Sequence, residues 1–278
     1  MNIKRILIIG GDSRTDYLLK ALSEDGYEAE KFSGNEPLKN AVDRSDAIVL
    51  GLPASKDDKT VDAPGITESV LIKDLFKMVG KNKLLLAGKM SDAMKAVADV
   101  FGVKWVDYFM RDELEILNAV PTCEGAVQIA MEELPITLFG ANVLVTGFGK
   151  VGEPLSVMLR HLGANVTVCA RKASQRAKAR TAGLKAVDFS FLEDCISDAD
   201  VVFNTVPQKI IGTSCLINAK NTLIIDLASK PGGVDMEKAK DFGVKVIWAL
   251  GLPGKVAPVT SGNIIKETIC NIFSESGE

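Results

Sequence analysis

The order of apolar and polar residues predicts strands that alternate with helices along most of the chain. Short apolar runs rich in β-branched residues or leucine are typical of strands buried in a parallel sheet. Such runs occupy residues 5–9, 47–50, 84–87, 103–106, 142–146, 165–170, 201–204, 222–226 and 244–249. Apolar residues recur at helical spacing between them, as in residues 151–162. This alternation predicts an α/β fold.

Two segments interrupt the alternation in the first half of the chain. Residues 51–65 are polar and rich in Pro, Asp and Lys, which predicts a mobile loop. Residues 121–134 predict a linking helix, because Thr122 can cap its start and Glu124 places negative charge in its first turn.

We therefore expect two doubly wound parallel-sheet domains and a returning helix. The first domain covers residues 1–134 and ends in the linking helix, and the second covers residues 135–258. Residues 259–278 predict a C-terminal helix, which we expect to pack back on the first domain by analogy with two-domain dehydrogenases. Its apolar face consists of Ile265, Ile269, Ile272 and Phe273.

A glycine motif after residues 142–146 indicates a dinucleotide site. Gly147, Gly149 and Gly152 form G-x-G-x-x-G, which permits a tight turn, close approach of a pyrophosphate and close packing of helix on strand. The helix that begins there directs free N–H groups at the phosphates. A strand on each side at the right distance makes the second domain a predicted NAD(P)-binding Rossmann fold.

The end of the following strand predicts which dinucleotide binds. An Asp or Glu that binds the ribose 2′-hydroxyl usually stands there, but this chain has Arg171. A guanidinium can bind a 2′-phosphate bidentately, whereas a carboxylate would repel it. We therefore expect NADP as the cofactor, the alternative being that Arg171 and Arg176 are solvated residues of the next helix.

The expected cofactor contacts lie in the glycine turn, after the next strand and after two later strands. Small residues at strand ends let the nicotinamide and ribose approach the backbone. The contacts are Gly147, Gly149, Lys150, Val151, Gly152, Arg171, Lys172, Ser174, Arg176, Asn204, Thr205, Val206, Pro207, Leu227, Ala228 and Ser229.

Four cations follow strand ends, where open α/β sheets bind ligands. We expect Arg14, Arg111, Lys230 and Lys255 to converge on an interdomain cleft and to act there on a small anionic substrate, most simply a carboxylate. Each taken alone also fits a solvated side chain. Asp12 either pairs with Arg14 in a turn, which its residue type favours, or accepts a proton in the cleft.

Composition excludes several classes of protein. A net charge of −3 gives no indication of nucleic-acid binding, and no apolar run is long enough to span a membrane. Five scattered cysteines without a C-x-x-C fit a reducing cytoplasm and predict neither disulfides nor a metal site. The single histidine, His161, lies off the apolar face of its helix, so we expect no histidine base in the cleft.

Six segments between residues 8 and 262 carry a resemblance to a known family. They are IIGGDSR, NAVPTCEGAVQIAMEE, VLVTGFGKVG, NTVP, LIIDLASKPGG and GLPGKVAPVTSG. The chain resembles the A subunits of dipicolinate synthase from spore-forming bacteria. Its second half is also similar to the NAD(P) domains of alanine and 2-hydroxyacid dehydrogenases.

The resemblance implies an activity and a partner. The activity is formation of pyridine-2,6-dicarboxylate (dipicolinate) from 4-hydroxy-tetrahydrodipicolinate or its dehydrated form, by NADP-dependent oxidation. The partner is a flavoprotein-like B subunit, and the setting is the mother-cell cytoplasm during sporulation. Homo-oligomerisation stays open. So do two alternatives, a generic NAD(P)-dependent carboxylate or amino-acid dehydrogenase and a non-catalytic nucleotide-binding subunit.

Overall fold

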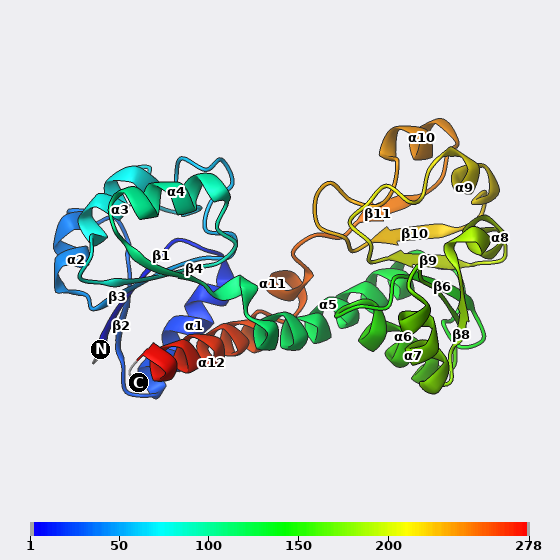
Figure 1. Cartoon of the computed structure of the whole chain (residues 1–278), viewed down its shortest axis with the longest axis horizontal. Helices are drawn as coiled ribbons and strands as arrows, with labels where there is room; N and C mark the ends of the chain where they lie inside the picture. Colours follow the sequence, from blue (N-terminus) through cyan, green and yellow to red (C-terminus); the bar gives the residue numbers. More distant parts are fainter. Residues whose placement is uncertain (1–2, 277–278) are drawn as a thin grey trace. The chain divides into compact units, whose positions relative to one another are not determined.

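The computed structural model describes residues 3–276, which form two compact units. The first unit contains the chain up to Asn118 and from Ala257 onward, and the second contains Ala119–Val256. Each unit is a parallel sheet with helices on both faces (Figure 1). The predicted α/β class and the two doubly wound sheets are therefore confirmed.

The first unit has a five-stranded sheet in the order β2-β1-β3-β4-β5. Its strands are β1 (Arg5–Ile9), β2 (Glu28–Lys31), β3 (Ala47–Leu50), β4 (Leu84–Ala87) and β5 (Lys104–Asp107). One face packs on α1 (Ser13–Glu24) and α12 (Pro258–Ser276). The other packs on α2 (Leu38–Arg44), α3 (Ile72–Val79) and α4 (Asp92–Val100). The strand order reverses between β1 and β3.

The second unit has a six-stranded sheet in the order β11-β10-β9-β6-β7-β8, the order of a Rossmann fold. Its strands are β6 (Asn142–Thr146), β7 (Asn165–Cys169), β8 (Lys185–Val187), β9 (Val201–Asn204), β10 (Leu223–Asp226) and β11 (Val246–Trp248). One face packs on α5 (Asp112–Glu133), α6 (Gly152–His161) and α7 (Ala173–Thr181). The other packs on α8 (Leu192–Ser197), α9 (Thr213–Asn218) and α10 (Met236–Asp241). A short helix, α11 (Leu252–Val256), follows β11.

The helix α5 begins earlier than its sequence predicted. It starts at Asp112, so Pro121 lies inside the helix and Thr122 does not cap it. Acidic residues in its first turn favour the earlier start. The border between the two compact units falls within α5, before Ala119 rather than after residue 134, because the second half of the helix packs in the core of the second unit.

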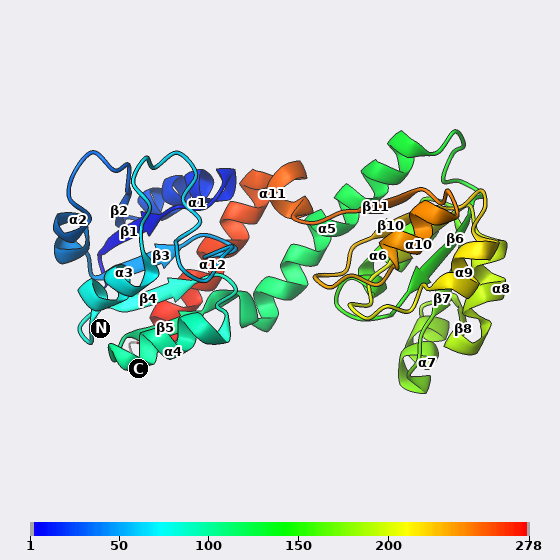
Figure 2. The same cartoon turned by 90° about the horizontal axis from the view of Figure 1, so that it is seen from above.

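The C-terminal helix α12 packs along α1, as expected (Figures 1 and 2). Its four predicted apolar residues are all buried in the core of the first unit. Across residues 3–276, no helix has the length and apolar character needed to cross a membrane.

The polar segment after β3 is held by hydrogen bonds, which does not fit the mobile loop we expected. The Asp57 carboxylate accepts hydrogen bonds from the backbone N–H groups of Lys59 and Thr60, at 2.9 and 2.8 Å. The carbonyl of Asp62 accepts one from the N–H of Gly11 at 2.8 Å. The segment is therefore tied to the turn that follows β1.

Candidate functional site

The glycine turn between β6 and α6 has the geometry of a phosphate cradle. A Cβ at Gly152 would lie 2.4 Å from the carbonyl oxygen of Gly147, so the turn requires glycine there. Gly147 has a φ of +86°, which also favours glycine. Open space surrounds Gly149, and no side chain caps the start of α6 at Val151. This uncapped helix start and this space fit the pyrophosphate of a dinucleotide.

The cradle lies at the point where the strand order of the second sheet reverses. β6 and β9 are neighbours there, and Thr205, just after β9, donates a hydrogen bond from Oγ1 to the carbonyl of Thr146 at 2.7 Å. Dinucleotides bind at such reversal points in open α/β sheets. The expected contacts Thr205, Val206 and Pro207 are partly or fully exposed beside the turn.

The turn after β7 presents two exposed cations, Arg171 and Lys172. In the described residues neither side chain makes a hydrogen bond or an ion pair. The third expected cation, Arg176, is engaged, because its Nη1 donates to the carbonyls of Ala170 and Arg171 and to Asp188 Oδ2, at 2.8, 2.7 and 2.6 Å. Arg176 thus holds the turn that carries Arg171. Ser174 is exposed in the first turn of α7.

A buried polar network lies beneath the strand ends of the second unit. Thr146 Oγ1 donates to Asn204 Oδ1 at 2.5 Å, and Asn204 Nδ2 donates to Asp226 Oδ1 at 2.7 Å. Asn204 is fully buried, and both its polar atoms are used inside the network. It therefore supports the site from below, whereas we had expected it to contact the cofactor.

The same network shapes the loop after β10. Asp226 is 1% exposed and accepts hydrogen bonds from the N–H groups of Ala228 and Gly233, at 3.0 and 2.8 Å. Trp248 Nε1 donates to the carbonyl of Ala228 at 2.8 Å. Sequence reasoning did not select Asp226 as a site residue. Its signal was a carboxylate at the last position of a buried strand, which needs donors nearby.

Two of the four expected substrate cations, Lys230 and Lys255, are exposed. Across the described part of the chain, neither ammonium has a hydrogen bond or an ion pair. Lys230 lies at the tip of the loop that Asp226 holds, beside the exposed Ser229 and the half-buried Leu227. Both lysines are therefore available to an anionic ligand.

Arg14, the third cation, is buried and paired with Asp12. Its Nε and Nη2 donate to the two oxygens of the Asp12 carboxylate, both at 2.8 Å, and Nη2 also donates to the carbonyl of Leu52. Burial raises the pKa of Asp12, but the hydrogen bonds and charge of Arg14 outweigh it and hold that pKa below its usual range. The Asp12 carboxylate also caps α1. The structural interpretation of Asp12 is thus confirmed.

Arg111, the fourth cation, is not brought together with Arg14. Its guanidinium binds Glu113 at 2.7 Å and Glu275 at 2.6 Å. Arg14 instead lies against Gly262. Gly262 and Glu275 are separated by about 20 Å of α12, at about 1.5 Å per residue. Two carboxylates already neutralise Arg111, so it is not a free anion ligand.

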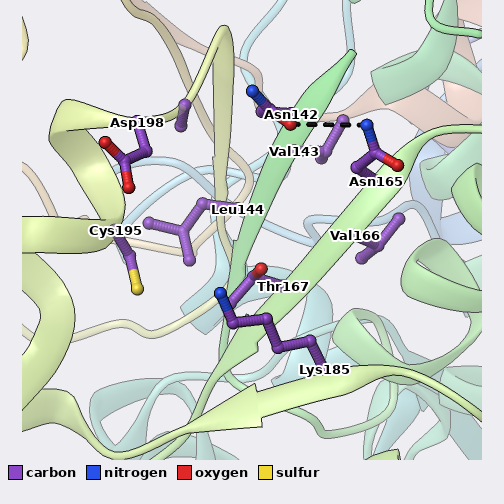
Figure 3. A pocket seen from close by; sticks show the side chains of 10 residues that line it. Asn142, Val143, Leu144, Asn165, Val166, Thr167, Lys185, Cys195 and Asp198 are labelled. Carbon is purple, nitrogen blue, oxygen red and sulfur yellow. Dashed lines mark hydrogen bonds between the residues drawn. The ribbon is translucent and has the colours of Figure 1, made fainter. Parts of the chain in front are cut away.

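A cavity of about 540 Å³ opens at the opposite, amino-terminal end of the second sheet (Figure 3). Asn142 and Asn165, joined by a 3.4 Å hydrogen bond, lie at the strand starts, and Lys185 and Cys195 line the wall. Burial raises the pKa of the Cys195 thiol, so it is a poor nucleophile at neutral pH. Because doubly wound sheets bind ligands at carboxyl ends, we place the candidate site at the glycine turn.

Comparison with known proteins matches both units. Residues 5–109 match the family model of the N-terminal domain of the dipicolinate synthase A subunit. Residues 123–225 match that of the NAD-binding domain of D-isomer specific 2-hydroxyacid dehydrogenases. The second unit therefore contains an NAD(P)-binding domain.

The chain is also similar to A subunits over its whole length. It is 30% identical to the dipicolinate synthase A subunit of Bacillus subtilis (strain 168), over 98% of this chain and 96% of that protein. The crystal structure of the A subunit from Bacillus halodurans superposes with a TM-score of 0.88 at 29% identity, covering 97% of each chain. That of the A subunit from Bacillus subtilis gives 0.88 at 29% identity, covering 99% of this chain and 97% of that one. The chain therefore belongs to the family of dipicolinate synthase A subunits.

Proposed function

We propose that this chain is the subunit of dipicolinate synthase that forms pyridine-2,6-dicarboxylate by NADP-dependent oxidation. The observation that carries the proposal is full-length similarity to A subunits in a chain whose glycine turn fits a dinucleotide. The preference for NADP rests on Arg171 and Lys172, exposed cations that can bind a 2′-phosphate. Arg176 acts as the positioning residue of that turn.

The proposed reaction balances as a dehydration followed by a two-electron oxidation. 4-Hydroxy-tetrahydrodipicolinate loses water, and the dihydro product then loses a hydride and a proton as the ring becomes aromatic. Bound NADP⁺ would accept the hydride. Since aromatisation favours the oxidation, the chain needs no histidine base, and its single histidine, His161, is exposed on α6.

The protein residues would bind and orient the substrate. We propose that Lys230 and Lys255, two exposed cations of the second unit, bind substrate carboxylates. Arg14 would act indirectly, because it holds Asp12 in the turn that follows β1. Arg111 would serve the packing of α12 on the first unit through Glu275.

The activity is tested with the purified chain, alone and with its B subunit. 4-Hydroxy-tetrahydrodipicolinate and NADP⁺ are supplied, and the ultraviolet absorbance of dipicolinate and the NADPH signal are followed together. We expect both to rise at equal rates. Their absence with and without the B subunit would contradict the activity. Full activity of both Lys230→Ala and Arg14→Ala would remove the proposed site and favour a non-catalytic subunit.

The cofactor preference is tested by Arg171→Asp. The variant should weaken NADPH binding by about 1–3 kcal/mol, the value of a lost charge-assisted hydrogen bond, and should leave NADH binding nearly unchanged. Lys240→Asp, a charge reversal at an exposed residue of α10, is the matched control. An equal loss for both cofactors would exclude a 2′-phosphate role for Arg171.

The proposal for the setting of the activity is supported by the same family membership. We propose that the chain works with a flavoprotein-like B subunit in the cytoplasm of the sporulating mother cell. Size-exclusion chromatography of the two purified subunits should show a complex. Two separate peaks at micromolar concentration, with activity from this chain alone, would contradict a stable partnership.

A further inference from the structure

Lys89 has an unusual backbone conformation at the carboxyl end of the first sheet. It is separated from β4 only by Gly88, at the edge where such sheets bind ligands. Its φ is +61°. Within residues 3–276, Asp58 is the one other residue besides glycines with a positive φ. An aspartate can offset this strain by bonding to nearby backbone, which a lysine side chain does not do.

A buried carboxylate holds this backbone in place. Asp107 is 7% exposed and accepts hydrogen bonds from the N–H groups of Lys89 and Met90, at 2.9 and 2.7 Å. On the other side, the carbonyl of Gly88 accepts a hydrogen bond from the N–H of Ala54 at 2.7 Å. The turn is therefore fixed from β5 and from the segment after β3.

The Lys89 side chain makes no polar contact that would offset this backbone strain. It is exposed, and its ammonium makes no hydrogen bond or ion pair among the residues the structure describes. Nearby cations on the same edge are paired, Arg14 with Asp12 and Lys56 with Asp62. Backbone strain that the fold enforces and that the side chain of the strained residue does not offset is typical of functional residues.

Lys89 also lies close in the structure to the Asp12–Arg14 pair. The N–H of Gly88 donates to the carbonyl of Gly51 at 3.3 Å, and the next residue, Leu52, accepts a hydrogen bond from Arg14. One edge of the first unit therefore carries a free ammonium and a carboxylate held ionised. The free ammonium of this edge fits a small anion.

We propose that the Lys89 ammonium binds a carboxylate of the substrate, an assignment that rests on the proposed function. The fold holds the backbone of Lys89 in its strained turn at the ligand edge of the first sheet. Its ligand class is a small carboxylate, and dipicolinate itself is the simplest probe. Lys89 is then a substrate-binding residue that sequence reasoning did not select, although it directly follows a predicted strand and a glycine.

The test compares three Lys89 variants in the full-length chain. Lys89→Met removes the charge, Lys89→Arg keeps it, and Lys89→Gly removes both the charge and the backbone strain. Lys95→Met, which removes a surface lysine of α4, is the matched control. For each protein we measure the KM for 4-hydroxy-tetrahydrodipicolinate, the Kd of dipicolinate with NADP⁺ present, and the midpoint of urea unfolding.

We expect Lys89→Met to raise KM and Kd by about 10- to 100-fold, and Lys89→Arg to restore most of the loss. Lys89→Gly should weaken binding as much as Lys89→Met without lowering the unfolding midpoint. Unchanged KM and Kd in Lys89→Met, with an active parent chain, would overturn the assignment alone. A parent chain that binds dipicolinate through Lys89 but forms none would overturn the proposed function alone. A parent chain that does neither would overturn both.

Discussion

Replacing Asp226 with alanine tests whether one buried carboxylate holds the loop that carries Lys230. Asp226 accepts three hydrogen bonds, from Asn204 Nδ2 at 2.7 Å, the N–H of Gly233 at 2.8 Å and the N–H of Ala228 at 3.0 Å. It is 1% exposed. Alanine would remove every acceptor at once and leave three buried N–H groups without acceptors, one of them on Asn204 Nδ2, whose other N–H still donates to the carbonyl of Val206 at 3.1 Å.

The size of the effect follows from those three donors. Each unpaired buried donor costs about 1–3 kcal/mol. Because the loop can open and admit water to part of the gap, we expect a total loss of about 3–5 kcal/mol in the free energy of unfolding of the second unit. Asp226→Asn keeps one acceptor oxygen but turns an amide N–H toward another donor. We therefore expect it to lower the free energy of unfolding by about 1–2 kcal/mol.

The assay must report on the second unit, because a chain of two units need not unfold in one step. The chain has two tryptophans, and Trp248 lies in the second unit, bonded to the same loop. Urea unfolding is therefore followed by Trp248 fluorescence in a Trp105→Phe background. Asp235→Ala is the control, because that aspartate caps α10 through a single N–H and should cost about 1 kcal/mol.

The same variants separate the loop from the cofactor site. Asp226→Ala should also weaken NADP⁺ binding, since Asp226 bonds Asn204, which lies next to Thr205 beside the glycine turn. If Asp226→Ala lowers the free energy of unfolding by no more than Asp235→Ala does, the reasoning is refuted. The three N–H groups would then find other partners without cost.

Three further predictions concern other parts of the molecule. Gly152→Ala should weaken NADP⁺ binding and also lower the free energy of unfolding, because its Cβ would lie 2.4 Å from a backbone oxygen. Gly149→Ala, in open space, should weaken NADP⁺ binding alone. Calorimetry measures the binding, and urea unfolding measures the stability. Hydrogen bonds from Arg5 lower the pKa of Asp46 to about 2. The ionised carboxylate therefore contributes about 1 kcal/mol to the free energy of unfolding above pH 4, and this contribution is lost as the pH falls to 2. Urea unfolding should show a difference in stability between parent and Asp46→Asn at pH 5 that is smaller at pH 2. Tyr108→Phe should cost about 1–2 kcal/mol in urea unfolding, because a buried carbonyl at the end of β3 loses its 2.9 Å partner, and an unchanged midpoint would exclude that bond as a stabilising contact.

Of the nine strands that the sequence predicted, seven lie inside the two sheets, and β5 and β11 are edge strands that still carry apolar residues. All nine apolar runs form strands, with ends that shift by at most two residues. The two strands it missed, β2 and β8, lie at sheet edges, where one side is open to solvent and fewer apolar residues are required. β2 reads EAEK, a sequence in which no periodicity can be seen.

The site was predictable from the sequence where the backbone geometry requires glycine. It was less predictable where the availability of a cation depends on the carboxylates that pair with it. The glycines of the turn are required by a local clash, which their spacing already indicates. Whether a cation is free depends on carboxylates far away in sequence. Glu275 engages Arg111 and Asp188 engages Arg176, and neither pairing follows from motif spacing. Lys89 was missed for a different reason, because its φ becomes visible only once the fold is known.

The assignment of α12 to the first unit sets the order in which the chain can complete its folding during synthesis. Five buried residues of α12 belong to the core that α1 and the first sheet form, and they leave the ribosome after the whole second unit. The second unit is continuous in sequence and is complete before α12 emerges. The unit that begins first is therefore completed after the second unit, and a nascent chain stalled before α12 emerges would carry a folded nucleotide domain together with an open apolar face that needs protection from aggregation.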